Sequence, residues 1–111
     1  MKDADFGKCP YATVQMLLSG KWTLAILILL STKTMRFNEL LRELPNLTQA
    51  TLTKQLRTLE KNSLIIRTVY NQIPPKVEYS LSDMGEKFKP VIKTMKAWGD
   101  EYNQIHPRKQ T

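Results

Sequence analysis

The sequence predicts a small α+β domain that is mainly helical, with helices on both sides of a single β-hairpin. Several stretches repeat apolar residues at spacings of three and four, which is typical of amphipathic helices. Residues 65–81 instead contain two short runs rich in Val, Ile, Thr and Tyr around the polar tip NQIPPK, which is typical of a hairpin. With 111 residues in total, the chain is expected to form one domain over residues 1–111.

Two helices are expected in the N-terminal part. The first covers residues 9–19 and ends before Gly20, a residue type that commonly stops helices. Residues 22–30 are apolar almost all round, so we expect a helix buried at the centre of the domain. Their length would also allow a strand, but Leu and Ala favour the helix.

A pair of helices joined by a short link is expected over residues 36–62. The stretch RFNELLREL is amphipathic and ends at Pro45, and the next stretch, TQATLTKQLRTLEKN, can be capped by the first of its threonines. On a helical wheel this second stretch has an apolar face and an opposite basic face. The basic face and its flanks consist of Thr48, Gln49, Ala50, Thr51, Thr53, Lys54, Arg57 and Lys61. Glu60 is the only acid in the stretch, whereas a merely solvated helix usually mixes charges of both signs.

The net charge indicates an anionic partner. Seventeen Lys and Arg residues against ten Asp and Glu residues give +7 at pH 7 and a pI near 9.7. Such a charge suits nucleic acid, an anionic membrane surface or an acidic protein. Two helices joined by a three-residue link form a helix-turn-helix, whose second helix enters the major groove of DNA. The sequence therefore predicts that the basic helix binds double-stranded DNA.

A hairpin that follows such a helix is the wing of a winged helix-turn-helix, so residues 65–81 are expected to reach the adjacent minor groove or its phosphates. Arg67 and Lys76 would supply positive charge to this wing. Pro74 and Pro75 would stiffen its tip, because proline fixes φ and has no N–H. A hairpin that only packs on the core is the alternative.

Six short elements run in order along nearly the whole chain: CP at 9–10, GKW at 20–22, RFNEL at 36–40, LTKQLRTLE at 52–60, PPKVEYSLSDMG at 74–85 and AWG at 97–99. In these elements the chain resembles the HxlR-type regulators, bacterial winged-helix proteins related to the MarR group. The resemblance implies a homodimeric transcription factor on a near-palindromic operator. We expect a repressor rather than an activator. Family members often carry Asp-Gly after the recognition helix, where this chain has Asn62 and Ser63, and of the two we expect Asn62 to accept positive φ.

Residues 82–105 are expected to form one long C-terminal helix with Ser82 as its N-cap and a kink at Pro90. Apolar residues spaced four and three apart follow it for three heptads, beginning at Met84. The part of this stripe expected to form a dimer interface is Phe88, Val91, Met95, Trp98, Tyr102 and Ile105. A second copy of the chain could cover the stripe, together with its N-terminal helix. Packing on the first helices of the same chain is the alternative.

Cys9 stands at the start of the first helix, next to Pro10. The positive end of the helix dipole and the neighbouring Lys8 favour a thiolate there. Some proteins of the resembled family sense quinones, aldehydes or oxidants through a cysteine in this region, which implies a redox sensor at Cys9 and a small-molecule or oxidant effector. A single cysteine is also commonly a small, partly buried apolar residue. Without a second cysteine in the chain, a disulfide would join two subunits or a small thiol.

Nothing in the sequence indicates an enzyme. The single His106 lies in a polar tail, and neither a Cys/His metal cluster nor a Gly-rich phosphate loop is present, so no cofactor or metal is expected. The longest apolar run, WTLAILILL, is too short for a membrane span, and the N-terminus lacks a secretory signal, so we expect a cytoplasmic protein. The alternative to a regulator is a winged-helix interaction module whose basic face binds an acidic partner.

Overall fold

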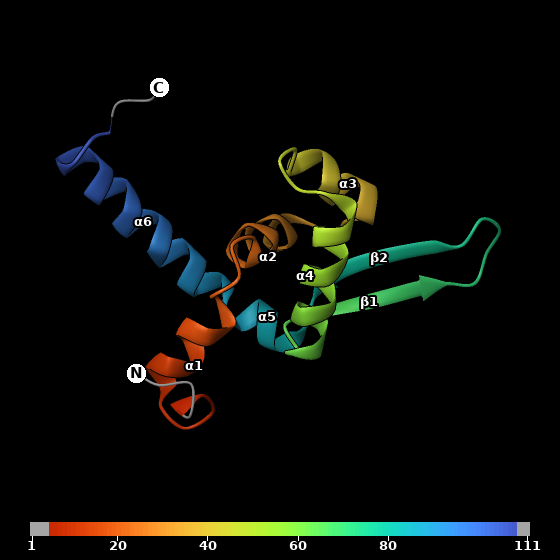
Figure 1. Ribbon diagram of the computed structural model, residues 1–111, viewed down its shortest axis with the longest axis horizontal. Helices are drawn as coiled ribbons and strands as arrows, with labels where there is room; N and C mark the ends of the chain where they lie inside the picture. Colours follow the sequence, from red (N-terminus) through yellow and green to blue (C-terminus); the bar gives the residue numbers. More distant parts are fainter. Residues whose placement is uncertain (1–4, 109–111) are drawn as a thin grey trace.

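The computed structural model describes residues 5–108. Within them the elements follow the order α1 (Pro10–Leu17), α2 (Thr23–Thr32), α3 (Phe37–Glu43), α4 (Gln49–Lys61), β1 (Ile65–Tyr70), β2 (Lys76–Leu81), α5 (Asp83–Lys87) and α6 (Lys89–Ile105). In Figure 1 the hairpin extends from one side of the helical body, and α6 extends from the other side. The predicted fold, a mainly helical winged helix-turn-helix, is confirmed.

The core lies where α2, α4 and the base of the hairpin meet. α4 buries the narrow face formed by Leu52, Leu56 and Leu59, each of which exposes 2% or less of its surface. Ile26 and Leu27 of α2 belong to the same buried cluster. Burying one such side chain contributes about 1.5–3 kcal/mol, so this cluster fixes α4 against the body and turns its opposite face outward.

The composition of α2 predicted a helix buried on all sides, but one side of it is exposed. Ile28 exposes 42% of its surface. With Leu24 it lines an open groove of about 430 Å³, whose other wall comes from Ile92 and Met95 of α6. The two apolar sides of α2 therefore have different surroundings, one in the core and one in a groove open to solvent.

The two strands of the hairpin are antiparallel, with Ile65 opposite Leu81 at the base and Tyr70 opposite Lys76 near the tip. Tyr79 connects this hairpin to the helix-turn-helix through two backbone hydrogen bonds with Met35, of 3.0 and 2.8 Å. Because Met35 directly precedes the segment that opens α3, the hairpin is attached to the helix pair at its base as well as through the chain.

A cluster of three small residues closes the base of the hairpin. Ser63 enters β1 with a φ of 63°, whereas Asn62 keeps a φ of −83° and caps α4. The expectation that Asn62 would take the positive φ was wrong, because its N–H still continues the helical bonding to the carbonyl of Thr58. Ser82 directly follows β2, at the same base of the hairpin. Its hydroxyl donates to the Ser63 carbonyl at 2.6 Å and accepts from the Gly85 N–H at 3.0 Å.

The single C-terminal helix expected over residues 82–105 was also wrong. α5 ends at Lys87 and α6 begins at Lys89, with Phe88 capping both helices. Pro90 lies in the first turn of α6, where a missing N–H breaks no helical bond. The proline therefore starts a new helix instead of kinking a continuous one, and Met84 lies on α5, apart from the stripe on α6. The first helix is likewise shorter than expected and ends at Leu17.

We expect Gly85→Ala to destabilise the protein. An added methyl group at Gly85 would overlap the Leu64 carbonyl oxygen and approach the Leu81 side chain. Overpacking of this kind costs about 1–3 kcal/mol in the free energy of unfolding. Gly99→Ala is the matched control, since nothing lies within 4 Å of its added methyl, and the helix should gain up to about 1 kcal/mol. Urea unfolding followed by circular dichroism measures both; an unchanged midpoint for Gly85→Ala would contradict the tight packing at this cluster.

Candidate nucleic-acid interface

α4 starts at a well-formed N-cap. The Thr48 hydroxyl accepts a hydrogen bond from the Thr51 N–H at 3.1 Å, as predicted. Thr48, Gln49 and Ala50 are exposed at this end of the helix. The cap therefore fixes the backbone of the first turn of α4, while the side chains of that turn, including the small Ala50, face solvent. A helix that enters the major groove requires this arrangement.

Three cations follow along the outer face of α4. Lys54, Arg57 and Lys61 are all exposed. The ion pairs found among residues 5–108 involve other side chains, so no acidic partner there neutralises these three charges. Phosphates that meet such cations release condensed counterions from DNA, which drives binding and makes it dependent on salt. The structure thus keeps the predicted basic stripe available to an anion.

The threonines of α4 differ in what they can still donate. The Thr53 hydroxyl already donates to the Gln49 carbonyl at 2.9 Å. The Thr51 hydroxyl instead accepts from Thr48 at 2.9 Å, which leaves its own proton free for a base edge or a phosphate oxygen. Thr51 is therefore the better candidate for a direct contact, and Thr53 would have to give up a bond within the helix.

Arg67 lies at the base of the wing, beside α4. Together with Arg57 it lines a groove of about 450 Å³ between α4 and the hairpin. Arg67 shares a face of the hairpin with Tyr79, which is opposite it in register. Glu60 lines the same groove. Two arginines from separate elements thus line one groove, an arrangement that the linear sequence did not indicate.

Lys76 is engaged within the wing. Its ammonium group lies 3.5 Å from the Glu78 carboxylate and 4.9 Å from the centroid of the Tyr70 ring. A hydrogen bond to Glu78 raises the pKa of Tyr70 above its ordinary value, since the carboxylate favours the protonated phenol. Part of the positive charge expected from Lys76 is therefore balanced by Glu78. Pro74 and Pro75 are exposed at the tip, as predicted.

Sequence reasoning missed two arginines, one at the N-cap of α3 and one in its last turn. Arg36 and Arg42 are exposed and line a groove of about 560 Å³ that continues to Pro75 and Lys76 of the wing. Glu39 lies between them, and its carboxylate accepts from the Arg36 N–H at 3.0 Å. That hydrogen bond lowers the pKa of Glu39. Their position on the outer face of a helix packed beside the recognition helix was the signal that could have identified them.

The apolar stripe along α6 is exposed to solvent. Val91, Met95, Trp98, Tyr102 and Ile105 are all exposed, with Trp98 and Ile105 showing 67% and 66% of their surfaces. The rings of Trp98 and Tyr102 stack at 5.3 Å. No residue of α6 is fully buried, so the rest of the chain leaves these five side chains largely uncovered.

Phe88 does not belong to this exposed stripe. It is half-buried and packs against the core of its own chain. Cys9, in contrast, is where the sequence placed it, as the N-cap residue of α1. Its side chain is half-buried, and its N–H donates to the Asp5 carbonyl at 2.9 Å.

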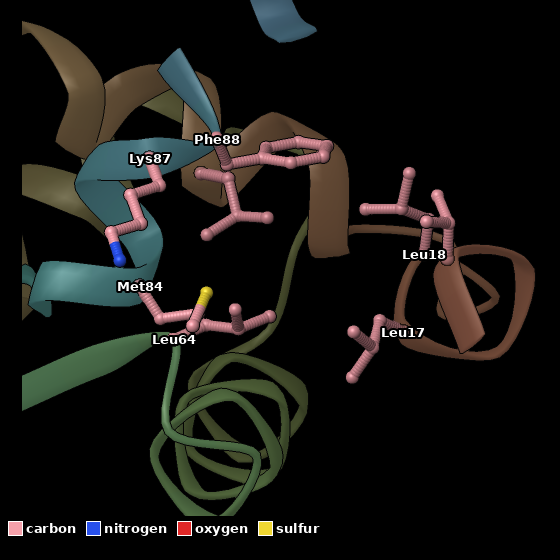
Figure 2. A pocket seen from close by; sticks show the side chains of 8 residues that line it. Leu17, Leu18, Leu64, Met84, Lys87 and Phe88 are labelled. Carbon is pink, nitrogen blue, oxygen red and sulfur yellow. The ribbon is translucent and has the colours of Figure 1, made fainter. Parts of the chain in front are cut away.

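An apolar cavity of about 200 Å³ lies between α1 and α5 (Figure 2). The labelled apolar walls are Leu17 and Leu18 on one side and Leu64, Met84 and Phe88 on the other. Lys87 lines the cavity with its stem, while its ammonium group points away (Figure 2). The cavity therefore presents only hydrocarbon and a thioether to whatever enters it.

Within residues 5–108 no group of three His, Cys, Asp or Glu side chains could hold a metal ion. None of the helices in that part of the chain is long and apolar enough to cross a membrane. A helix-turn-helix with an exposed basic second helix and an adjoining hairpin defines a winged-helix DNA-binding protein.

Comparison with known proteins agrees with this class. Residues 17–107 match the family described as HxlR-like helix-turn-helix. The HTH-type transcriptional regulator YdeP of Bacillus subtilis (strain 168) is 47% identical over 98 residues, which cover 88% of this chain and 77% of that protein. The crystal structure of the HTH-type regulator YtcD is 41% identical with a TM-score of 0.82, covering 86% of this chain and 98% of that one.

The redox regulator HypR in its oxidized form is also similar, with 37% identity and a TM-score of 0.78 over 93% of this chain and all of that one. The chain belongs to the HxlR-like helix-turn-helix family. It is a DNA-binding transcriptional regulator, and the relatives confirm the expectation that it is not an enzyme.

Proposed function

We propose that the protein is a homodimeric repressor of a near-palindromic operator in double-stranded DNA, and that oxidants or electrophiles acting at Cys9 change its binding. The observation that carries the proposal is the outer face of α4, where three exposed cations have no acidic partner among residues 5–108. This face adjoins the wing, so one surface can meet a major groove and the neighbouring minor groove together.

In the proposed complex the N-terminal half of α4 lies deepest in the major groove. Gln49, Thr51 and Lys54 then face base edges or the nearest phosphates, because the recognition helix of this motif reads bases with its first turns. Arg57 and Lys61, further along the helix, meet the sugar-phosphate backbone. Phosphate contacts fix the register of the protein on DNA, and base contacts select the sequence.

The exposed stripe of α6 supports the dimer. A contiguous row of large apolar side chains on a projecting helix is a common mark of a protein interface. The open groove between α2 and α6 extends this apolar surface through Ile28 and Met95. Two copies joined there would present two α4 helices to half-sites one DNA turn apart, about 34–36 Å, which is the spacing that a near-palindromic operator offers.

The position of Cys9 supports a redox input. It is the N-cap residue of α1, and the similar protein HypR is described as a redox regulator. In the proposed reaction, one thiol from each subunit joins the other in a disulfide and gives two electrons and two protons to the oxidant. A quinone would instead form a bond to a single sulfur atom, and the thiol proton would pass to the quinone. Either product changes the surroundings of α1.

Replacing Lys54 or Arg57 by Ala should weaken operator binding and lower its dependence on salt. Each lost phosphate contact reduces the slope of log K against log salt by about 0.9. The assay is fluorescence anisotropy on the DNA upstream of the protein's own gene and on a shuffled duplex, at several salt concentrations. Lys93→Ala removes the same charge from α6 and should leave the slope unchanged. Equal slopes in all four proteins would contradict the role of α4, and equal binding to both duplexes would favour an acidic-protein partner instead.

Truncating Trp98 and Tyr102 together to Ala should weaken the dimer by about tenfold or more, since buried aromatic residues dominate interface energies. Gln104→Ala, on the opposite side of α6, should leave association unchanged. Sedimentation equilibrium over a range of protein concentrations gives the dissociation constants. A double variant that remains as dimeric as the unaltered protein would mean that another surface joins the subunits.

Cys9→Ser should abolish the response of DNA binding to diamide or to a quinone while leaving binding by the reduced protein intact. The serine hydroxyl resembles the thiol in size but forms neither a disulfide nor a thioether under these conditions. Anisotropy before and after treatment gives the response, and non-reducing electrophoresis shows whether two chains become linked. The same loss of binding in the treated variant would place the reactive site elsewhere.

A further inference from the structure

The tip of the wing carries no charge of its own. Residues 71–75, with the sequence NQIPP, are all exposed, and none of them ionises. The nearest cation, Lys76, is engaged with Glu78 and Tyr70 on the strand. Arg67 lies in the groove beside α4, at the base of the hairpin. The far end of the wing is therefore made of two amides, an isoleucine and two prolines.

Ile73 is the most exposed large apolar residue among residues 5–108, with an exposed fraction of 101%. No contact within the chain explains its presence at the end of a projecting hairpin (Figure 1). A phosphate group offers an isoleucine nothing, since it would lose hydration without gaining an apolar contact. A groove lined by sugar C–H groups does offer such a contact, and proteins that bind the minor groove insert apolar side chains of this kind.

The reach of the wing fits the geometry of B-DNA. Each strand has six residues and so extends by about 20 Å at roughly 3.3 Å per residue. The major groove and the next minor groove on the same side lie about half a turn apart, or roughly 17 Å. With α4 in the major groove, the tip can therefore enter the minor groove, beyond the row of phosphates between them.

We propose that the tip of the wing reads A·T base pairs in the minor groove, with Asn71 and Gln72 as hydrogen-bonding residues and Ile73 as the apolar contact. The proposal rests on the function proposed above. In the minor groove, A·T pairs present only acceptors, the N3 of adenine and the O2 of thymine, to which the amide NH₂ groups can donate. A G·C pair adds the guanine 2-amino group, which obstructs Ile73, and an amide could meet this donor only by turning its oxygen toward it and giving up the bond from its NH₂ group. The uncharged tip thus contributes more to the choice of DNA sequence than to the overall affinity for DNA.

The test starts with the full-length protein and a pool of duplexes randomised over 40 base pairs, from which bound sequences are selected and read. The expected result is a pair of half-sites flanked on their outer sides by A·T-rich steps. Selected duplexes are then rebuilt with the flanking A·T pairs replaced by G·C or by inosine·cytosine. Inosine lacks the 2-amino group, so its pair with cytosine resembles A·T in the minor groove and G·C in the major groove.

We expect inosine·cytosine flanks to bind within about twofold of A·T flanks, and G·C flanks to bind about tenfold more weakly, as for the loss of one good base contact. Asn71→Ala with Gln72→Ala should reduce this tenfold preference to about twofold or less. Ile73→Ala should lower affinity for the A·T-flanked duplex several-fold. Ile66→Ala, a half-exposed isoleucine near the base of the same hairpin, is the matched control and should change neither value.

Three results would overturn this inference and leave the proposed regulator in place. Inosine·cytosine flanks that behave like G·C would place the readout in the major groove. A preference that persists unchanged in the tip variants would mean that DNA shape, and not these side chains, selects the flanks. Half-sites without any flanking preference would leave the tip no role in selection. A pool with no enriched sequence at all would instead contradict the proposed regulator, and this inference with it. Because the altered side chains are exposed, melting curves should confirm that each variant folds.

Discussion

The contact between Ser63, Ser82 and Gly85 is the constraint on which the placement of every functional element depends. Ser63 turns the chain out of α4 with a positive φ, and Ser82 returns it into α5. The Ser82 hydroxyl bonds to the Ser63 carbonyl and also caps α5, while Gly85 leaves room for the backbone of Leu64. Both ends of the wing and the ends of two helices are thus fixed at one point, which sets the angle of the wing to α4.

Charge is divided unevenly over the surface that this arrangement creates. α4 and its neighbours carry exposed arginines and lysines that face solvent, and the groove beside α4 brings Arg57 and Arg67 together. On the wing, Lys76 is drawn into a pair with Glu78, which leaves the end of the hairpin uncharged. Attraction to DNA is therefore concentrated at the recognition helix. This distribution would make affinity sensitive to salt while the contacts of the tip depend on hydrogen bonds and shape.

The parts of this structure that follow from local periodicity were predictable. The apolar face of α4 was found because a helix repeats every 3.6 residues, which brings Leu52, Leu56 and Leu59 onto one side. What sequence reasoning missed depends on contacts across the fold. The register sets Tyr70 opposite Lys76, so the Tyr70 ring lies 4.9 Å from the lysine ammonium group, and no local pattern reveals that contact. The break at Phe88 likewise follows from its packing on the core, which directs α6 away from α5.

The same break links the wing to the proposed dimer. α5 has only five residues, and Phe88 joins it directly to α6, so no flexible linker lies between the base of the hairpin and the apolar stripe. The Ser82 cap holds α5 to the end of α4 through Ser63. In a dimer formed through α6, the distance between two recognition helices would therefore be set by a short chain of capped helices. With such a rigid spacing, the dimer could distinguish operators whose half-sites are correctly spaced from operators whose half-sites are not.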